Sequence, residues 1–70
     1  MRVAESGAIL SKQELAVLRY LSYGKEAPWI AQRLGIKEST VRTYVSRAEK
    51  KLKAKNRAHA ITIAIQRQMI

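Results

Sequence analysis

The sequence predicts an all-α fold built from four short helices, and three observations lead to this prediction. Apolar residues recur every three or four positions through most of the chain, as they do along one face of an α-helix. Residues that favour helix ends occur at intervals that suit short helices: Ser11, Gly24, Gly35 and Asn56. No stretch of useful length alternates apolar and polar residues as a strand does.

The composition excludes several classes of protein. The 70 residues suffice for one small domain with a modest core. Without cysteine there is no disulfide framework or thiolate metal site, and the one histidine, His59, forms no metal site alone. No nucleophile–base pair or phosphate-binding glycine loop is present, so we expect no catalytic residue, metal or cofactor. No run resembles a membrane span or signal-peptide core, which favours a cytoplasmic protein without a membrane partner.

Positive charge is concentrated in one part of the chain. The formal net charge is +9, and eight of the 14 basic residues lie within residues 37–57, against two acidic residues there, Glu38 and Glu49. Such clustering favours a polyanionic partner, because basic side chains release counterions from it on binding. Charge alone does not separate DNA from RNA, from an acidic membrane or from simple solubility.

The first nine residues lack a clear period, and we interpret residues 1–9 as a loose N-terminal arm and residues 10–70 as the domain. Ser11 and Glu14 have the spacing of a capping box, in which each side chain bonds the backbone of the other residue. A first helix is therefore expected from there to about Ser22, with Gly24 ending it in a left-handed conformation.

A second, shorter helix is expected between Pro28 and Gly35. Proline suits the first turn of a helix, where its missing N–H costs little. Residues 35–38 then form a turn of the length that joins the two helices of a helix-turn-helix, with Ile36 filling the space between them.

Residues 37–53 form the third predicted helix, which is amphipathic. Its apolar stripe consists of Val41, Val45, Ala48 and Leu52. The opposite side carries hydroxyl groups and positive charge, and such a face suits either a DNA major groove or solvent. Lys37 is a poor N-cap, so Glu38 or Ser39 is expected to cap this helix instead.

Asn56 is a good N-cap for a fourth helix over residues 57–68. The β-branched run at residues 60–65 also suits a strand, but an isolated strand would have no partner in a helical domain. Ala60, Ile63 and Ala64 supply one apolar stripe. A second apolar stripe, Ala58, Ile61, Ile65 and Met69, is the predicted interface of a homodimer through this helix. The alternative is a helix that the N-terminal arm covers or that stays partly exposed. His59 is expected on an exposed face.

The order of these residues resembles the LuxR-type (NarL/FixJ, GerE-like) DNA-binding domain over almost the whole chain, from Leu10 to Ile70. The residues that carry the resemblance are Leu10, Ser11, Glu14, Val17, Leu18, Leu21, Gly24, Ile30, Ala31, Leu34, Ile36, Thr40, Val41, Arg42, Lys51, Leu52, Arg57 and Ala60. The resemblance implies a four-helix helix-turn-helix domain whose third helix enters the major groove and whose fourth helix pairs in a dimer. It therefore implies a sequence-specific transcription regulator.

The resemblance also implies roles for individual residues. The base-facing residues would be Arg42, Thr43 and Ser46. The phosphate-binding residues would be Ser39, Thr40, Tyr44, Arg47 and Lys51. Tyr44 replaces a common histidine of the family, and Ala16 and Trp29 stand where the family usually has acidic residues, so apolar packing is expected to replace an internal charge pair there.

Several readings stay open at this point. The segment 46–52 also looks like the end of a sigma-factor region 4 domain, although the capped fourth helix argues against that module. A basic protein-interaction module is a further alternative. The partners expected on the leading interpretation are double-stranded DNA, a second copy of the chain and RNA polymerase. The chain is either an autonomous regulator or the C-terminal part of a longer one.

Overall fold

A computed structural model describes residues 10–70 of this chain, and the predicted arm at residues 1–9 lies outside the described residues. The elements are α1 (Lys12–Ser22), α2 (Ala27–Leu34), α3 (Glu38–Leu52) and α4 (Arg57–Gln66). No strand occurs within this part of the chain, and the β-branched run at residues 60–65 is helical. The all-α prediction is therefore confirmed. None of the helices over residues 10–70 is long and apolar enough to cross a bilayer.

The helix ends follow from local chemistry. The Ser11 hydroxyl accepts from the Glu14 N–H at 3.1 Å, and a Glu14 oxygen accepts from the Ser11 N–H at 2.8 Å, which confirms the capping box. Gly24 and Gly35 follow α1 and α2 with φ of 88° and 70°, a left-handed conformation that glycine adopts at little cost. The Asn56 side chain accepts from the His59 N–H at 2.8 Å and begins α4, which ends at Gln66, two residues earlier than predicted.

The beginning of α3 differs from the expectation. Lys37 occupies the N-cap position with extended backbone angles, and no side chain makes a capping hydrogen bond there. Neither Glu38 nor Ser39 replaces it, because both are already within the helix or its first turn. The backbone at this end is therefore held by the turn from α2, where the Ile36 N–H donates to the Ala31 carbonyl at 2.9 Å.

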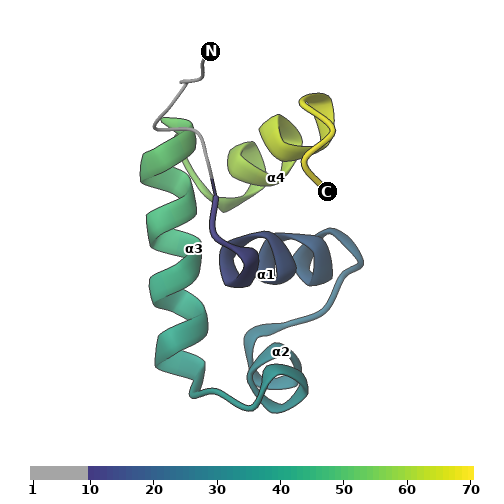
Figure 1. Ribbon diagram of the computed structural model, residues 1–70, viewed down its shortest axis with the longest axis vertical. Helices are drawn as coiled ribbons and strands as arrows, with labels where there is room; N and C mark the ends of the chain where they lie inside the picture. The colour runs from purple at the N-terminus through teal and green to yellow at the C-terminus, as the bar shows by residue number, and fades with distance from the viewer. Residues whose placement is uncertain (1–9) are drawn as a thin grey trace.

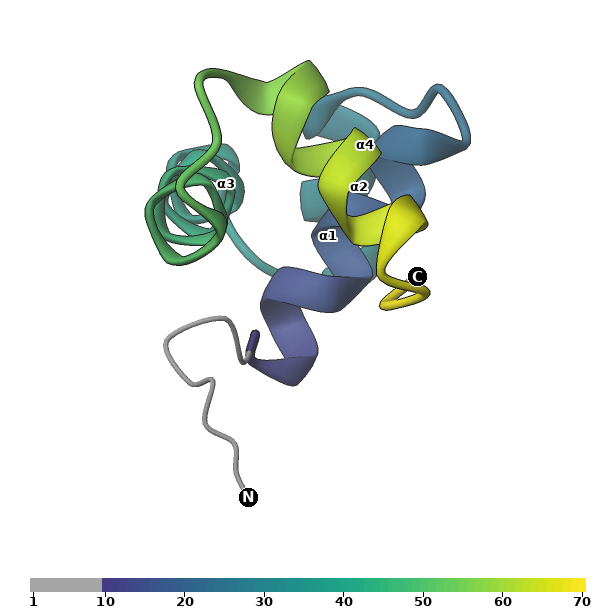
Figure 2. The ribbon, with the colours of Figure 1, turned by 90° about the horizontal axis from the view of Figure 1, so that it is seen from above.

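The other three helices are arranged around α3, which is the longest. Figure 1 shows α3 along the long axis of the molecule, with α2 beside one of its ends, α4 beside the other and α1 between them. Figure 2, which looks along α3, shows that the other three helices lie together on one side of it. Helix α3 packs against each of them, and α1 also packs against α4.

Two apolar clusters form the core, one at each half of α3. The cluster near the end of α3 joins α1, α3 and α4 through the buried residues Leu10, Leu18, Ala48, Leu52, Ala60 and Ala64. The cluster near its start joins α1, α2 and α3 through Val17, Ile30, Ala31 and Val41. The predicted apolar stripe of α3 thus faces inward, with Val45 half-buried at its edge.

One ion pair links the start of α1 to the end of α3. Lys51 Nζ donates to Glu14 Oε1 at 2.9 Å, and the Glu14 side chain is only 2% exposed. Burial by itself raises the pKa of this carboxyl group. The ammonium group of Lys51 and the Ser11 N–H outweigh that effect and hold the Glu14 pKa below its ordinary value of 4.5. Glu14 is therefore ionised at neutral pH.

His59 does not lie on an exposed face as predicted. It is half-buried, and its Nδ1 accepts from the Lys55 N–H at 2.9 Å. Together with the Asn56 cap, this bond closes the turn between α3 and α4. The spacing of Lys55 and His59 does not predict this hydrogen bond, because the bond depends on the path of the turn between α3 and α4.

We expect Glu14→Gln to lower the free energy of unfolding at neutral pH by about 1–3 kcal/mol, because it removes the charge of a buried, hydrogen-bonded carboxylate. A folded-state pKa below the unfolded one stabilises the protein above the unfolded value, and this contribution is lost as pH falls through the folded value. The difference between the two proteins should therefore shrink below about pH 4.

Denaturant unfolding of both proteins between about pH 7 and pH 2 measures this difference. Glu26→Gln is a matched control, since Glu26 is exposed and has no ion pair among the described residues. An equal loss in both variants, or a difference that does not change with pH, would contradict the proposed role of Glu14.

Candidate nucleic-acid interface

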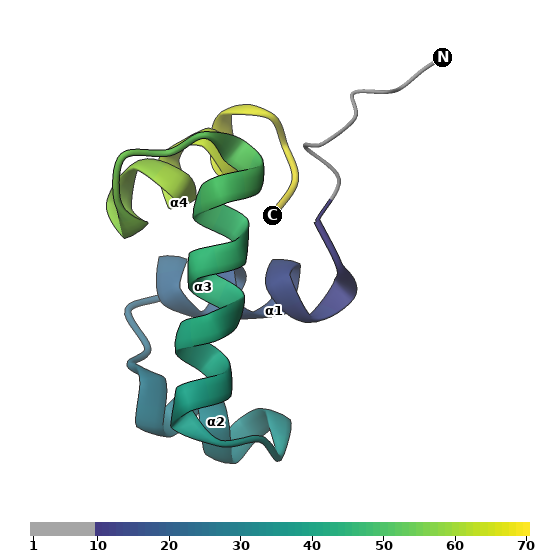
Figure 3. The same cartoon turned by 90° about the vertical axis from the view of Figure 1, so that its left-hand side faces the viewer.

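The outward face of α3 is polar, positively charged and uncovered. Figure 3 views the molecule with α3 in front and no other helix across it. Its exposed residues with hydroxyl or cationic groups are Ser39, Arg42, Thr43, Ser46, Arg47, Lys50 and Lys51. A single α-helix presented in this way has the width that a major groove admits.

The three predicted base-facing residues, Arg42, Thr43 and Ser46, are all exposed and follow one another along α3. Arg42 forms an exposed ion pair with Glu38, one turn earlier, at 3.2 Å. The Thr43 hydroxyl donates to the Ser39 carbonyl, one turn earlier, at 3.0 Å. The structure therefore brings these residues together on a surface that a duplex can approach.

The five predicted phosphate-binding residues fall into two groups. Ser39 and Arg47 are exposed and share the outward face, with the Arg47 guanidinium 6.0 Å from the Tyr44 ring centroid. Thr40 and Tyr44 are half-buried, and Tyr44 packs against the cluster shared with α2. Lys51 lies on the same flank as Tyr44, where Glu14 already holds its ammonium group. Of the five, only Ser39 and Arg47 present their polar groups freely on the outward face.

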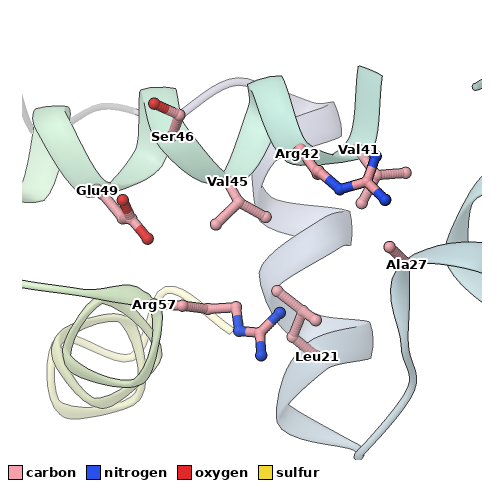
Figure 4. A pocket seen from close by; sticks show the side chains of 8 residues that line it. All are labelled: Leu21, Ala27, Val41, Arg42, Val45, Ser46, Glu49 and Arg57. Carbon is pink, nitrogen blue, oxygen red and sulfur yellow. The ribbon is translucent and has the colours of Figure 1, made fainter. Parts of the chain in front are cut away.

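An open hollow of about 360 Å³ lies on the other flank of α3 (Figure 4). Its lining residues come from all four helices: Leu21, Ala27, Val41, Arg42, Val45, Ser46, Glu49 and Arg57. The Arg57 side chain extends from the first residue of α4 toward Leu21 and Val45. Arg57 thus lines the same hollow as two of the predicted base-facing residues, Arg42 and Ser46.

Two cations at this surface were given no DNA-binding role from the sequence, Lys50 and Arg57. Lys50 is exposed and lies one turn after Ser46, so the helical spacing was sufficient to include it. Arg57 had no such signal, because its position beside α3 depends on the path of the α3–α4 turn. Neither residue forms an ion pair within residues 10–70.

Apolar packing occupies one position where an acidic residue is usual in the resembled domain. Trp29 packs edge-on against Tyr20 at 5.1 Å between ring centroids, and the Lys25 ammonium lies 4.7 Å from the Trp29 ring. Trp29 keeps 40% of its surface exposed and meets the cluster shared by α1, α2 and α3 through Tyr20. Over residues 10–70 no group of three His, Asp or Glu side chains is placed to hold a metal ion.

Comparison with known proteins identifies relatives that are regulators. Residues 8–64 match the family described as "Bacterial regulatory proteins, luxR family". Over 60 residues the chain is 38% identical to the uncharacterized transcriptional regulatory protein YxjL of Bacillus subtilis, covering 86% of this chain and 28% of YxjL. Over 53 residues it is 47% identical to the transcriptional regulatory protein DesR of the same species, covering 76% and 27%.

A third relative comes from another organism. The DNA-binding transcriptional activator EvgA of Escherichia coli is 44% identical over 55 residues, which cover 79% of this chain and 27% of EvgA. The chain therefore spans less than a third of the length of each of these relatives.

The two groups of phosphate candidates predict different behaviour. Arg47→Ala should reduce the slope of log affinity against log salt by roughly one and leave the free energy of unfolding nearly unchanged. Lys51→Ala leaves the buried Glu14 carboxylate without its cation, so it should cost about 1–3 kcal/mol of stability and change the salt slope less. Titrations of duplex DNA at several salt concentrations, together with denaturant unfolding, measure both effects. A loss of stability in Arg47→Ala, together with the larger change of salt slope in Lys51→Ala, would refute these roles.

Proposed function

This chain belongs to the luxR family of bacterial regulatory proteins, and we propose that it is a sequence-specific, double-stranded DNA-binding transcription regulator. The observation that supports this function best is the uncovered polar and cationic face of α3, which α2 and the Gly35 turn hold from behind. Such a helix reads base edges in the major groove, while neighbouring cations bind phosphates.

Within this proposal, the exposed residues of α3 divide by their chemistry. Arg42 donates to guanine O6 and N7, Thr43 presents its methyl group to thymine, and Ser46 bonds a base edge. Ser39, Arg47 and Lys50 bind phosphates along the same face, with Thr40, Tyr44 and Lys51 at its flank. The DNA backbone contributes most of the affinity, and the base contacts select the sequence.

We further propose that two copies bind two half-sites through paired α4 helices. Of the four residues predicted for this interface, Ala58 and Ile65 are exposed, and Ile65 keeps 53% of its surface exposed. Ile61 and Met69 instead pack partly against the core of their own chain. A paired interface therefore centres on Ala58 and Ile65, and the operator has half-sites about one helical turn apart, or a multiple of it.

The same proposal includes the setting in which the regulator works. A transcription regulator of a bacterial family acts in the cytoplasm, where the chromosome lies, and RNA polymerase is the protein whose action it changes. The relatives are more than three times as long as the part that this chain matches, so the proposal concerns the function of the matched part alone.

Selection of bound duplexes from a random library tests the function directly. We expect the chain to select a defined sequence and to bind it more tightly than a scrambled duplex of the same composition. Repeating the titration at several salt concentrations separates the two contributions, because phosphate contacts weaken with salt for every duplex. Affinity that falls steeply with salt but never favours one sequence would instead indicate a basic interaction module.

Arg42→Ala should reduce the affinity for the selected operator by about 1–3 kcal/mol and relax the preference for guanine at one position. The reason is that arginine is the side chain on this face that donates two parallel hydrogen bonds to guanine. Competition titrations against operators with single base changes measure the preference. Unchanged selectivity at every position would exclude Arg42 as a base reader.

Ile65→Glu should give a folded monomer with weaker operator binding, because it places a charge in the proposed seam between two α4 helices. Ile65 is the suitable position, since a charge at the half-buried Ile61 would also disturb the core of the same chain. Sedimentation, alone and on DNA, measures the oligomeric state. The dimer would be refuted by a parent protein that stays monomeric at high concentration and on a two-half-site operator.

A further inference from the structure

Glu38 lies where a groove-reading helix begins. It is the first residue of α3, and its side chain is 46% exposed. Arg42 follows one turn later on the same side, with its side chain 66% exposed, and the two groups are joined at 3.2 Å. The first turns of the second helix in a helix-turn-helix are the part that contacts base edges. The carboxylate therefore stands beside the guanidinium at the reading end of α3.

Stability alone does not require this arrangement. A carboxylate in the first turn and an i,i+4 ion pair each stabilise an exposed helix by a few tenths of a kcal/mol. Against this small gain, a negative side chain on the face presented to a polyanion opposes binding unless it finds a hydrogen-bond donor. The other acidic residue of α3, Glu49, lies on the same flank about three turns later, but it is half-buried. Glu38 is thus the acidic group of α3 most directly presented to a duplex.

The edges of the bases determine which donor a carboxylate accepts from. In the major groove, guanine presents two acceptors, thymine presents an acceptor and a methyl group, and adenine presents an acceptor beside its amino group. Cytosine presents the N4 amino group without a neighbouring acceptor. Cytosine is therefore the base that a carboxylate approaches with the least repulsion, and its N4 group is the usual donor to Glu and Asp side chains.

We propose that Glu38 is a specificity-determining residue that accepts a hydrogen bond from a cytosine N4 amino group in the operator. This role rests on the proposed function of α3 as a groove reader. Residues one turn apart are separated by about 6 Å along the helix axis, and successive base pairs by about 3.4 Å. Glu38 thus reads a cytosine within about two base steps of the guanine read by Arg42. Their exposed ion pair is weak enough to open when both side chains take bases as partners.

The test compares three purified proteins: wild type, Glu38→Gln and Glu26→Gln. Glu26 is an exposed carboxylate just before α2, so Glu26→Gln removes the same charge away from α3 and controls for general electrostatics. Each protein selects duplexes from a random library, and affinities are then measured for the wild-type operator with every single base change. Circular dichroism and denaturant unfolding establish that both variants fold, as expected for changes at exposed positions.

We expect Glu38→Gln to lose about tenfold of the preference for cytosine at one position, while the guanine preference assigned to Arg42 stays. Glu26→Gln should keep both preferences. Three results would overturn the role: an unchanged operator for Glu38→Gln, the same change in Glu26→Gln, or a loss of the guanine preference alone, which would make Glu38 a support for Arg42. A wild type that selects no sequence would refute the proposed function of α3 itself. A wild type that selects an operator which Glu38→Gln leaves unchanged would refute only the role of Glu38.

Discussion

The contact between Glu14 and Lys51 is the constraint on which the arrangement of the helices depends. One carboxylate closes the first turn of α1 through the Ser11 N–H and also accepts from the ammonium group near the end of α3. Because Glu14 is buried, loss of the Lys51 contact would leave a desolvated charge without its cation. The pair therefore ties the end of α3 to the start of α1, and it acts together with the packing of Ala48 and Leu52 beside Leu18.

The rotation of α3 decides which of its residues are available to a partner. With Ala48 and Leu52 turned into the cluster beside Glu14, the residues on the opposite side are left outward. At the other half of α3, Val41 packs with Ile30 and Ala31 of α2, so both halves are held from behind. A reading surface on a helix supported along its length keeps its side chains in a fixed register, which sequence-specific recognition needs.

Helix α4 packs into the core through small side chains on one side and presents a larger apolar side chain on the other. Ala60 and Ala64 are fully buried, so the backbone of α4 approaches α1 and α3 closely. This approach leaves Ile65 pointing outward and brings Arg57, at the start of the helix, beside the flank of α3. One helix thus supplies an apolar surface at its far end and a cation next to the candidate interface.

Most of the fold was determined by the sequence itself, because its signals act over one helical turn: the Ser11–Glu14 box, the left-handed Gly24 and Gly35, the Asn56 cap and the stripe of α3. The outward grouping of Arg42, Thr43 and Ser46 follows from the same periodicity. Only the tertiary structure decided that Lys51 pairs with Glu14, 37 residues away, and that His59 is half-buried. It also decided that Ile61 and Met69 pack against their own core, whereas Ala58 and Ile65 stay exposed. These depend on how the helices and turns are placed against one another, and no local spacing encodes that placement.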